Sequence, residues 1–157
     1  MLEAAGDGGA AFARVLDVNV MGSVHAVAQF LAHQRRGVPA SVVLVGSTAG
    51  QRGESGYGAY AASKAALMGL AKSWAVELAP LSVRVNVAAP GWVDTDMTAS
   101  VLGDAQARRS IEASIPRGRV ASPDDLAGPI AFLLSDDSLH VTGTVLSVNG
   151  GGVLASY

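Results

Sequence analysis

The feature that most constrains this chain is a regular exchange between two kinds of apolar pattern along its 157 residues. Two short β-branched runs, at 41–46 and 83–88, show no polar alternation, which is typical of strands buried on both faces of a parallel sheet. Around them, apolar residues recur at helical spacing or strong helix formers predominate. Helix, strand, helix, strand, helix, strand is the rhythm of a doubly wound α/β sheet with right-handed crossovers.

These patterns place the expected elements by residue number. Helices are predicted at about 9–33, at 60–78, and from the Ser-Pro-Asp-Asp cap signal at 122–125 to residue 134. Strands are predicted at 41–46, 83–88 and 144–148, with a Gly-rich loop at 47–58 and an irregular segment from 90 to about 121. Three strands make half of a doubly wound sheet, so the expected fold is α/β, a partial Rossmann-like parallel sheet in one domain over 1–157.

Composition narrows the range of partners. Half of the residues are hydrophobic, 15% are charged and the formal net charge is -2. This charge produces no positive electrostatic potential that would attract nucleic acid or an anionic membrane. Cysteine is absent, and His25, His33 and His140 lie too far apart for a local metal motif, so no metal site is predicted. The first residues lack a secretory signal pattern and the uncharged stretch at 138–157 is interrupted by polar residues, so we expect a cytoplasmic protein without a membrane span.

Polar groups and a turn follow the two buried strands. Ser47 comes directly after the first strand, and the Pro90-Gly91 turn follows the second. Ligands of open α/β sheets bind beyond the carboxyl ends of the strands, so both positions are candidate site residues. Tyr60 begins the next predicted helix and Lys64 lies one turn further on the same face.

The pairing of Tyr60 with Lys64 has a chemical use. A free tyrosine has a pKa of about 10 and is a poor general base near neutrality, but an adjacent cation favours its ionised form. A unit charge about 4 Å away in a partly buried site is worth on the order of 4 kcal/mol, about the size that a shift to neutrality requires. The Ser47 hydroxyl can hold a substrate oxygen while Tyr60 gives or takes its proton. Alone, Tyr-x-x-x-Lys is a weak motif, and its value here comes from the neighbouring strand ends.

Four motifs at these positions resemble the short-chain dehydrogenase/reductase family: Val-Leu-Val-Gly-Ser47, Tyr60-Ala-Ala-Ser-Lys64, Asn86-Val-Ala-Ala-Pro90-Gly91 and Gly143-x-x-Leu-x-Val-Asn-Gly-Gly. The resemblance implies that Tyr60 is the catalytic acid/base and that Ser47 orients the substrate. It implies that Lys64 lowers the tyrosine pKa and holds the nicotinamide ribose. Asn19, in Asp17-Val-Asn19-Val-Met-Gly, matches the asparagine that holds a proton-relay water.

The resemblance also implies a nicotinamide cofactor, NAD(P)(H), and a small carbonyl or alcohol substrate. Segment 90–95 resembles the stretch that lies against the nicotinamide, and the implied cofactor contacts are Tyr60, Lys64, Pro90, Gly91, Val93 and Thr95. Segment 98–120 is expected to form a mobile substrate lid, with Tyr57 and Trp92 as pocket walls. Segments 90–98 and 115–119 look most like members that reduce 3-oxoacyl thioesters.

The cofactor-binding βαβ units with which the family begins have no counterpart that we recognise in this sequence. Gly6-Asp-Gly8-Gly-Ala-Ala11 spells Gly-x-Gly-x-x-Ala, but only five residues precede it, too few for the strand that the motif requires. We therefore expect a single incomplete Rossmann-type domain, the catalytic half, whose first strand has a bare edge. Family members associate through the helices that correspond to 15–31 and 62–78, so a homo-oligomer is expected.

Two functions remain open on the sequence. The first is a nicotinamide-dependent oxidoreductase, and the second is a truncated, non-catalytic interaction module that cannot bind the cofactor alone. A serine hydrolase is disfavoured because Val45 and Ala49 stand where a nucleophile elbow around Ser47 needs glycines.

Overall fold

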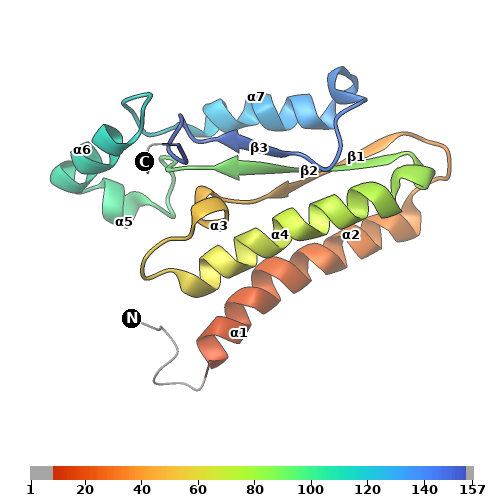
Figure 1. Cartoon of the computed structure of the whole chain (residues 1–157), viewed down its shortest axis with the longest axis horizontal. Helices are drawn as coiled ribbons and strands as arrows, with labels where there is room; N and C mark the ends of the chain where they lie inside the picture. The colour runs from red at the N-terminus through yellow and green to blue at the C-terminus, as the bar shows by residue number, and fades with distance from the viewer. Residues whose placement is uncertain (1–8, 155–157) are drawn as a thin grey trace.

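The computed structural model describes residues 9–154, which form a three-stranded parallel sheet with helices on both faces (Figure 1). The strands β1 (Ala40–Val45), β2 (Val83–Pro90) and β3 (Val145–Val148) lie side by side in that order. β1 pairs with β2 from Ala40 opposite Val83 to Val45 opposite Ala88, and β2 pairs with β3 up to Pro90 opposite Val148. All three carboxyl ends therefore meet at one edge of the sheet. The α/β fold predicted from the apolar runs is confirmed.

One face of the sheet is covered by the helical run before β1 and by the helix between β1 and β2 (Figure 1). The run consists of α1 (Ala10–Leu16), a π-helical segment η1 (Asp17–Met21) and α2 (Gly22–His33), and the second helix is α4 (Gly58–Glu77). On the other face lies α7 (Pro123–Leu134), which begins at a capping box between Ser122 and Asp125. All three predicted helices are confirmed, and within them only the π-helical segment was not expected.

The main core lies between β2 and the helices of the first face. It is built from buried aliphatic side chains: Val27, Leu44, Leu67, Ala71, Leu78, Val83, Val85 and Val87. β2 is buried along nearly its whole length because both of its edges are paired. β1 has a similar apolar composition but is less buried, and Val45 is 46% exposed. Within residues 9–154, the second edge of β1 has no strand partner.

Three short helices lie in segments that were predicted to be irregular. α3 (Thr48–Arg52) lies in the predicted loop at 47–58, and α5 (Ala99–Leu102) and α6 (Ala105–Ser114) lie between 90 and 121. The prediction was wrong there because α3 and α6 begin at side-chain caps rather than in an apolar repeat, and α5 has only four residues and no side-chain cap. The Ser47 hydroxyl accepts from the backbone N–H of Ala49 at 3.1 Å, and a carboxylate oxygen of Asp104 accepts from that of Ala107 at 2.7 Å. Single 3₁₀ turns follow α4 (η2, Ala79–Leu81) and α7 (η3, Asp136–Ser138).

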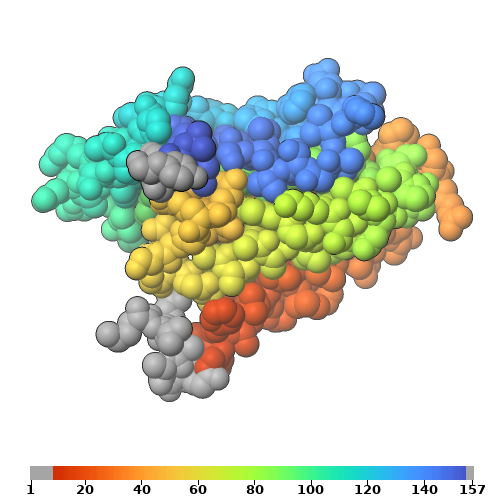
Figure 2. Space-filling model, in the orientation of Figure 1, coloured from red at the N-terminus to blue at the C-terminus, as the bar shows by residue number. Residues whose placement is uncertain are grey.

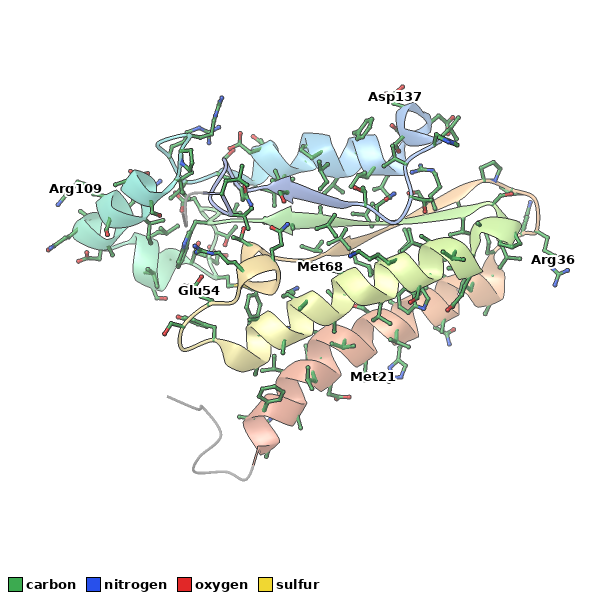
Figure 3. All side chains as sticks on the ribbon, viewed as in Figure 1. Met21, Arg36, Glu54, Met68, Arg109 and Asp137 are labelled. Atoms are coloured by element: carbon green, nitrogen blue, oxygen red, sulfur yellow. The ribbon has the colours of Figure 1, made fainter. Side chains whose placement is uncertain are left out.

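The helical run from Ala10 to His33 packs along α4 and forms one rim of the molecule (Figure 2). Apart from Val27, its residues are only partly buried or exposed, and Met21 lies on its outer side (Figure 3). By length and apolar composition alone this run could cross a membrane, although no membrane span was expected from the sequence. A helix that covers a sheet meets the same two criteria.

Candidate active site

The carboxyl ends of the strands lie where α3, α5 and α6 gather (Figure 1). Ser47 follows β1 as the N-cap of α3. α3 packs against α4 so closely that a Cβ on Gly50 would lie 2.7 Å from the backbone nitrogen of Ala65. The missing side chain of Gly50 therefore allows α3, which Ser47 caps, to lie against α4 at Lys64 and Ala65. The sequence analysis did not single out this glycine.

Tyr60 and Lys64 lie one turn apart on α4, as predicted. The ammonium nitrogen of Lys64 lies 5.7 Å from the centroid of the Tyr60 ring, within cation–π range. The same nitrogen donates a hydrogen bond to the carbonyl oxygen of Val45 at 2.9 Å. Because Val45 is the last residue of β1, the lysine joins the tyrosine to the strand end that carries Ser47. Among the described residues, the hydroxyls of Ser47 and Tyr60 make no hydrogen bond to each other.

Burial acts on the lysine as well. Lys64 is half-buried between α4 and β1, and desolvation of its ammonium holds the pKa of Lys64 below the ordinary value of 10.5. The charge on this side chain is therefore more costly than on a surface lysine. Its one hydrogen-bond acceptor in the structure is the Val45 carbonyl.

Asn19 lies in the π-helical segment η1, a type of helix irregularity that is frequent at functional sites. Its amide nitrogen donates to the hydroxyl of Ser63 at 3.0 Å, and that hydroxyl donates to the backbone carbonyl of Tyr60 at 2.7 Å. The backbone carbonyl of Asn19 accepts from the Ser23 hydroxyl at 2.8 Å. Asn19 is thus connected to the turn that carries Tyr60 through Ser63, a buried residue that the sequence analysis passed over.

The loop after β2 contains the other predicted contacts. Pro90 ends β2, and Gly91 packs against Asn149 so tightly that a Cβ would lie 2.9 Å from the Asn149 Cβ. The Thr98 hydroxyl donates to the carbonyl oxygen of Val93 at 2.6 Å and accepts from the backbone N–H of Thr95 at 3.1 Å. Thr98 therefore closes the turn that carries both predicted contacts, a role that only the folded loop reveals.

Two hollows border this region. A cleft of about 290 Å³ is lined by Trp92, residues of the segment 115–121 and the turn after β3. It does not include Ser47, Tyr60 or Lys64. A larger groove of about 560 Å³ lies between η1–α2 and the free edge of β1, and Asn19 and Lys64 both line it. Tyr57, the other predicted pocket wall, is 52% exposed beside the start of α4 and lines neither hollow.

The predicted lid, 98–120, has an apolar cluster of its own. Leu102, Ile115 and Val120 are buried together, with Trp92 and Ile111 packed against them. Its base is closed by two backbone hydrogen bonds, from Asp94 N–H to the Ala121 carbonyl and from Ala121 N–H to the Trp92 carbonyl. Arg108 of α6 also donates to the Asp94 carboxylate at 2.8 Å. The segment is therefore attached to the loop after β2 at both its base and its helix.

Two further predictions concern metals and phosphates. Within residues 9–154, no three His, Asp or Glu side chains are grouped so that they could hold a metal ion. In the Gly6-Asp-Gly8-Gly-Ala-Ala11 match, the first three residues lie outside the described residues. Gly9, with φ +91°, is the N-cap of α1.

Known proteins share both the sequence and the fold. A family model described as Enoyl-(Acyl carrier protein) reductase matches residues 7–152. The 3-oxoacyl-[acyl-carrier-protein] reductase FabG of Thermotoga maritima is 41% identical over 143 residues, 89% of this chain and 56% of the relative. The chain thus spans about half the length of the curated relatives it matches.

Two solved structures show the same arrangement of elements. A short-chain type dehydrogenase/reductase from Mycobacterium ulcerans is 33% identical with a TM-score of 0.87, covering 92% of this chain and 52% of that one. A gluconate 5-dehydrogenase from Burkholderia cenocepacia, in complex with NADP and tartrate, is 27% identical with a TM-score of 0.82 and covers 91% and 56%. All of these relatives are reductases or dehydrogenases by name.

Proposed function

Because this chain belongs to the short-chain dehydrogenase/reductase family, we propose that it serves hydride transfer between NAD(P)(H) and a carbonyl or alcohol substrate, with Tyr60 as acid/base. When bound, the nicotinamide gives or takes the hydride. The observation that carries the proposal is the ammonium of Lys64, which lies 5.7 Å from the Tyr60 ring centroid and is hydrogen-bonded to the end of β1. A phenol, a cation and the Ser47 hydroxyl thereby lie around one strand end.

Each side chain has a proposed task. Tyr60 moves a proton to or from the substrate oxygen, and Ser47 hydrogen-bonds the same oxygen. The ammonium of Lys64 provides a positive charge beside the Tyr60 ring. Asn19 and Lys64 line the same groove, which supports a water-mediated proton path between them. The Asn19 amide is already hydrogen-bonded to Ser63 of α4. We therefore expect Asn19 to contribute to this path by orienting η1 relative to α4.

The residues at the strand ends fit the nicotinamide end of such a cofactor. Lys64 offers a cation, Thr95 a hydroxyl and Val93 backbone polar groups, all from segments that follow β1 and β2. Pro90 and Gly91 lead from β2 into this loop. The chain spans about half the length of the curated relatives it matches. We propose that 1–157 corresponds to the catalytic half of the family's domain and that the other end of the cofactor is held outside it.

The names of the relatives support a proposal for the substrate class. The curated relatives are 3-oxoacyl-[acyl-carrier-protein] reductases, whereas the solved structures include a gluconate 5-dehydrogenase. We favour a 3-oxoacyl thioester, reduced at its ketone, in a cytoplasmic protein. The pocket is bounded in this proposal by Trp92 and the lid at 98–120, and not by Tyr57, which lines neither hollow.

A direct test measures reduction of a short 3-oxoacyl thioester with NADPH and with NADH. The assay uses the chain alone and the chain with a separate polypeptide that supplies the part of the relatives it does not match. Tyr60→Phe should lower turnover by about 10²–10⁴-fold, the usual contribution of a positioned acid/base. Tyr57→Phe removes the same group from an exposed tyrosine that lines neither hollow, and it should lower turnover far less. Full activity of Tyr60→Phe would reject the proposed role of the phenol.

A second candidate, a non-catalytic interaction module, is supported by the groove along β1. This groove combines the unpaired edge of β1 with the largely exposed side of η1 and α2. An unprotected apolar edge accepts another strand readily. Titration of NADPH fluorescence separates the two functions. The module predicts no binding under any condition, and the enzyme predicts binding at least when the second polypeptide is present.

A further inference from the structure

Thr48 follows Ser47 directly and is only 8% exposed. Its hydroxyl donates to the carbonyl oxygen of Pro90 at 3.0 Å and accepts from the amide nitrogen of Asn149 at 3.4 Å. Thr48 comes after β1, Pro90 ends β2 and Asn149 comes after β3. One buried hydroxyl therefore connects the carboxyl ends of all three strands.

The acceptor of this hydrogen bond belongs to the turn after β2. The Pro90 carbonyl and the Gly91 N–H are the two polar groups of one peptide bond, which is planar. The carbonyl accepts from Thr48, and the N–H donates to the Val148 carbonyl at 3.3 Å. Rotation of this peptide plane would break both bonds. The Asn149 side chain is held as well, because its oxygen accepts from the Gly151 N–H at 3.0 Å.

The donor belongs to α3, which has only five residues. A helix of this length is not stable by itself, so its position depends on tertiary contacts. Gly50 sets how closely it approaches α4, and Thr48 attaches it to the end of β2. Ser47, the cap of α3, moves with it.

We propose that Thr48 is a positioning residue of the candidate active site. It keeps the Ser47 hydroxyl in register with the Pro90–Gly91 turn. The inference rests on the proposed function, since that function places the substrate oxygen at Ser47 and the nicotinamide at the turn. Misplacement of such groups by about 1 Å can cost on the order of 100-fold in rate.

The test compares Thr48→Val, which keeps the shape and removes the hydroxyl, with Thr48→Ser, which keeps the hydroxyl. Thr142→Val is the matched control, because Thr142 also bonds the backbone of β2, at Val85, but far from this edge. Amide hydrogen exchange of Gly91, measured by NMR on the full chain, reports on the peptide plane directly. Thr48→Val should raise the Gly91 exchange rate about tenfold, as expected for loss of one hydrogen bond, and Thr48→Ser should restore it. Thr142→Val should leave it unchanged.

Kinetics provide the second measurement, in whichever preparation of the wild-type protein is active. Thr48→Val should lower kcat about 10–100-fold with a smaller change in KM, and Thr48→Ser should recover most of it. An inactive wild type in every preparation would count against the proposed function. Unchanged Gly91 exchange in Thr48→Val, or a kcat equal to that of Thr142→Val, would overturn the positioning role.

Discussion

Lys64 is the single residue on which the proposed chemistry depends most. Its ammonium contacts the Tyr60 ring and the last carbonyl of β1, and burial lowers the pKa of Lys64. A partly desolvated cation acts more strongly on a neighbouring phenol than a surface cation does. Burial of the Lys64 ammonium is therefore unfavourable for folding, but it places a cation next to Tyr60.

The lowered pKa of Lys64 leads to a prediction about stability and pH. Between that lowered value and 10.5, the unfolded chain binds more protons than the folded chain, so stability should rise with pH. Below this window the full desolvation penalty applies, and above it the penalty vanishes. Urea unfolding at several pH values from 7 to 10.5 should show the wild type gaining stability relative to Lys64→Met. A difference that stays constant, or falls, contradicts the burial effect.

Ser63 is the residue through which Asn19 reaches the catalytic turn. Its buried hydroxyl both accepts from the Asn19 amide and donates to the Tyr60 carbonyl. The Tyr-x-x-x-Lys motif does not specify which residue stands at this position. In the folded chain it connects η1 to α4, so the position of Tyr60 depends on a helix 41 residues earlier in the chain.

Among the elements, α3 affects the position of Ser47 most directly, because Ser47 is its N-cap. It has five residues, and its contact with α4 at Gly50 leaves no room for a side chain. The backbone of α4 at Lys64 and Ala65 forms the other side of this contact. Ser47 and Tyr60 are thus placed by the approach of two helices rather than by either helix alone.

Gly50→Ala should separate α3 from α4. Its Cβ would lie 2.7 Å from the backbone of α4, and overpacking of this kind costs about 1–3 kcal/mol. Gly69→Ala is the matched control, since a Cβ there meets nothing within 4 Å and alanine favours a helix by about 1 kcal/mol. Denaturant unfolding should therefore show a loss for the first variant and none for the second. Equal stability of the two variants would contradict the close contact.

The end of α7 depends on an arginine from β2. Arg84 donates to the carbonyl oxygens of Leu133 and Ser135, each at 3.0 Å, and to that of Val141 at 3.2 Å. The Leu133 and Ser135 carbonyls also accept from the Ser138 hydroxyl, so Arg84 is one of several donors at the end of this helix. One side chain therefore joins β2, α7 and the segment that leads to β3.

Arg84→Met should lower the free energy of unfolding by about 1.5–3 kcal/mol, the usual range for hydrogen bonds made by a charged group. Arg109, exposed on α6 (Figure 3), provides a control because its replacement by Met breaks no such bond among the described residues. Thermal unfolding followed by circular dichroism compares the two variants. The role of Arg84 is refuted if both variants melt together.

For the whole molecule, the main feature is that one side is incompletely covered. The helical run Ala10–His33 and α4 present apolar side chains to the surface, among them Val18 and Val76, which is 77% exposed. Exposed apolar surface of this extent is typical of an interface. It agrees with the proposed association through 15–31 and 62–78.

Light scattering of the purified chain should accordingly give a mass above 15.8 kDa. Val76→Lys should shift the population toward the monomer, because a charge in an apolar interface is costly. Leu139→Lys is the control, since this residue is 60% exposed but lies after α7, away from both helices. A well-folded monomer at every concentration would rule out association through these helices.

The sequence predicted the long elements and the pairing of Tyr60 with Lys64 because both depend on local spacing. Apolar runs without alternation indicate buried strands, and side chains four residues apart share a helix face. Ser47 was found in the same way, as the polar residue directly after a strand. The helices α3, α5 and α6 were missed because they are short and depend on caps and packing.

What the sequence alone determined is therefore the order and type of the main elements and the chemical groups at the strand ends. Only the tertiary structure decided that Thr48 is hydrogen-bonded to Pro90 and Asn149. The same holds for the close approach of α3 and α4 at Gly50 and for the hydrogen bond from Asn19 to Ser63. These contacts join residues that lie 14 to 101 positions apart in the chain. No local pattern records such a contact, because it exists only after the sheet has brought the strand ends together.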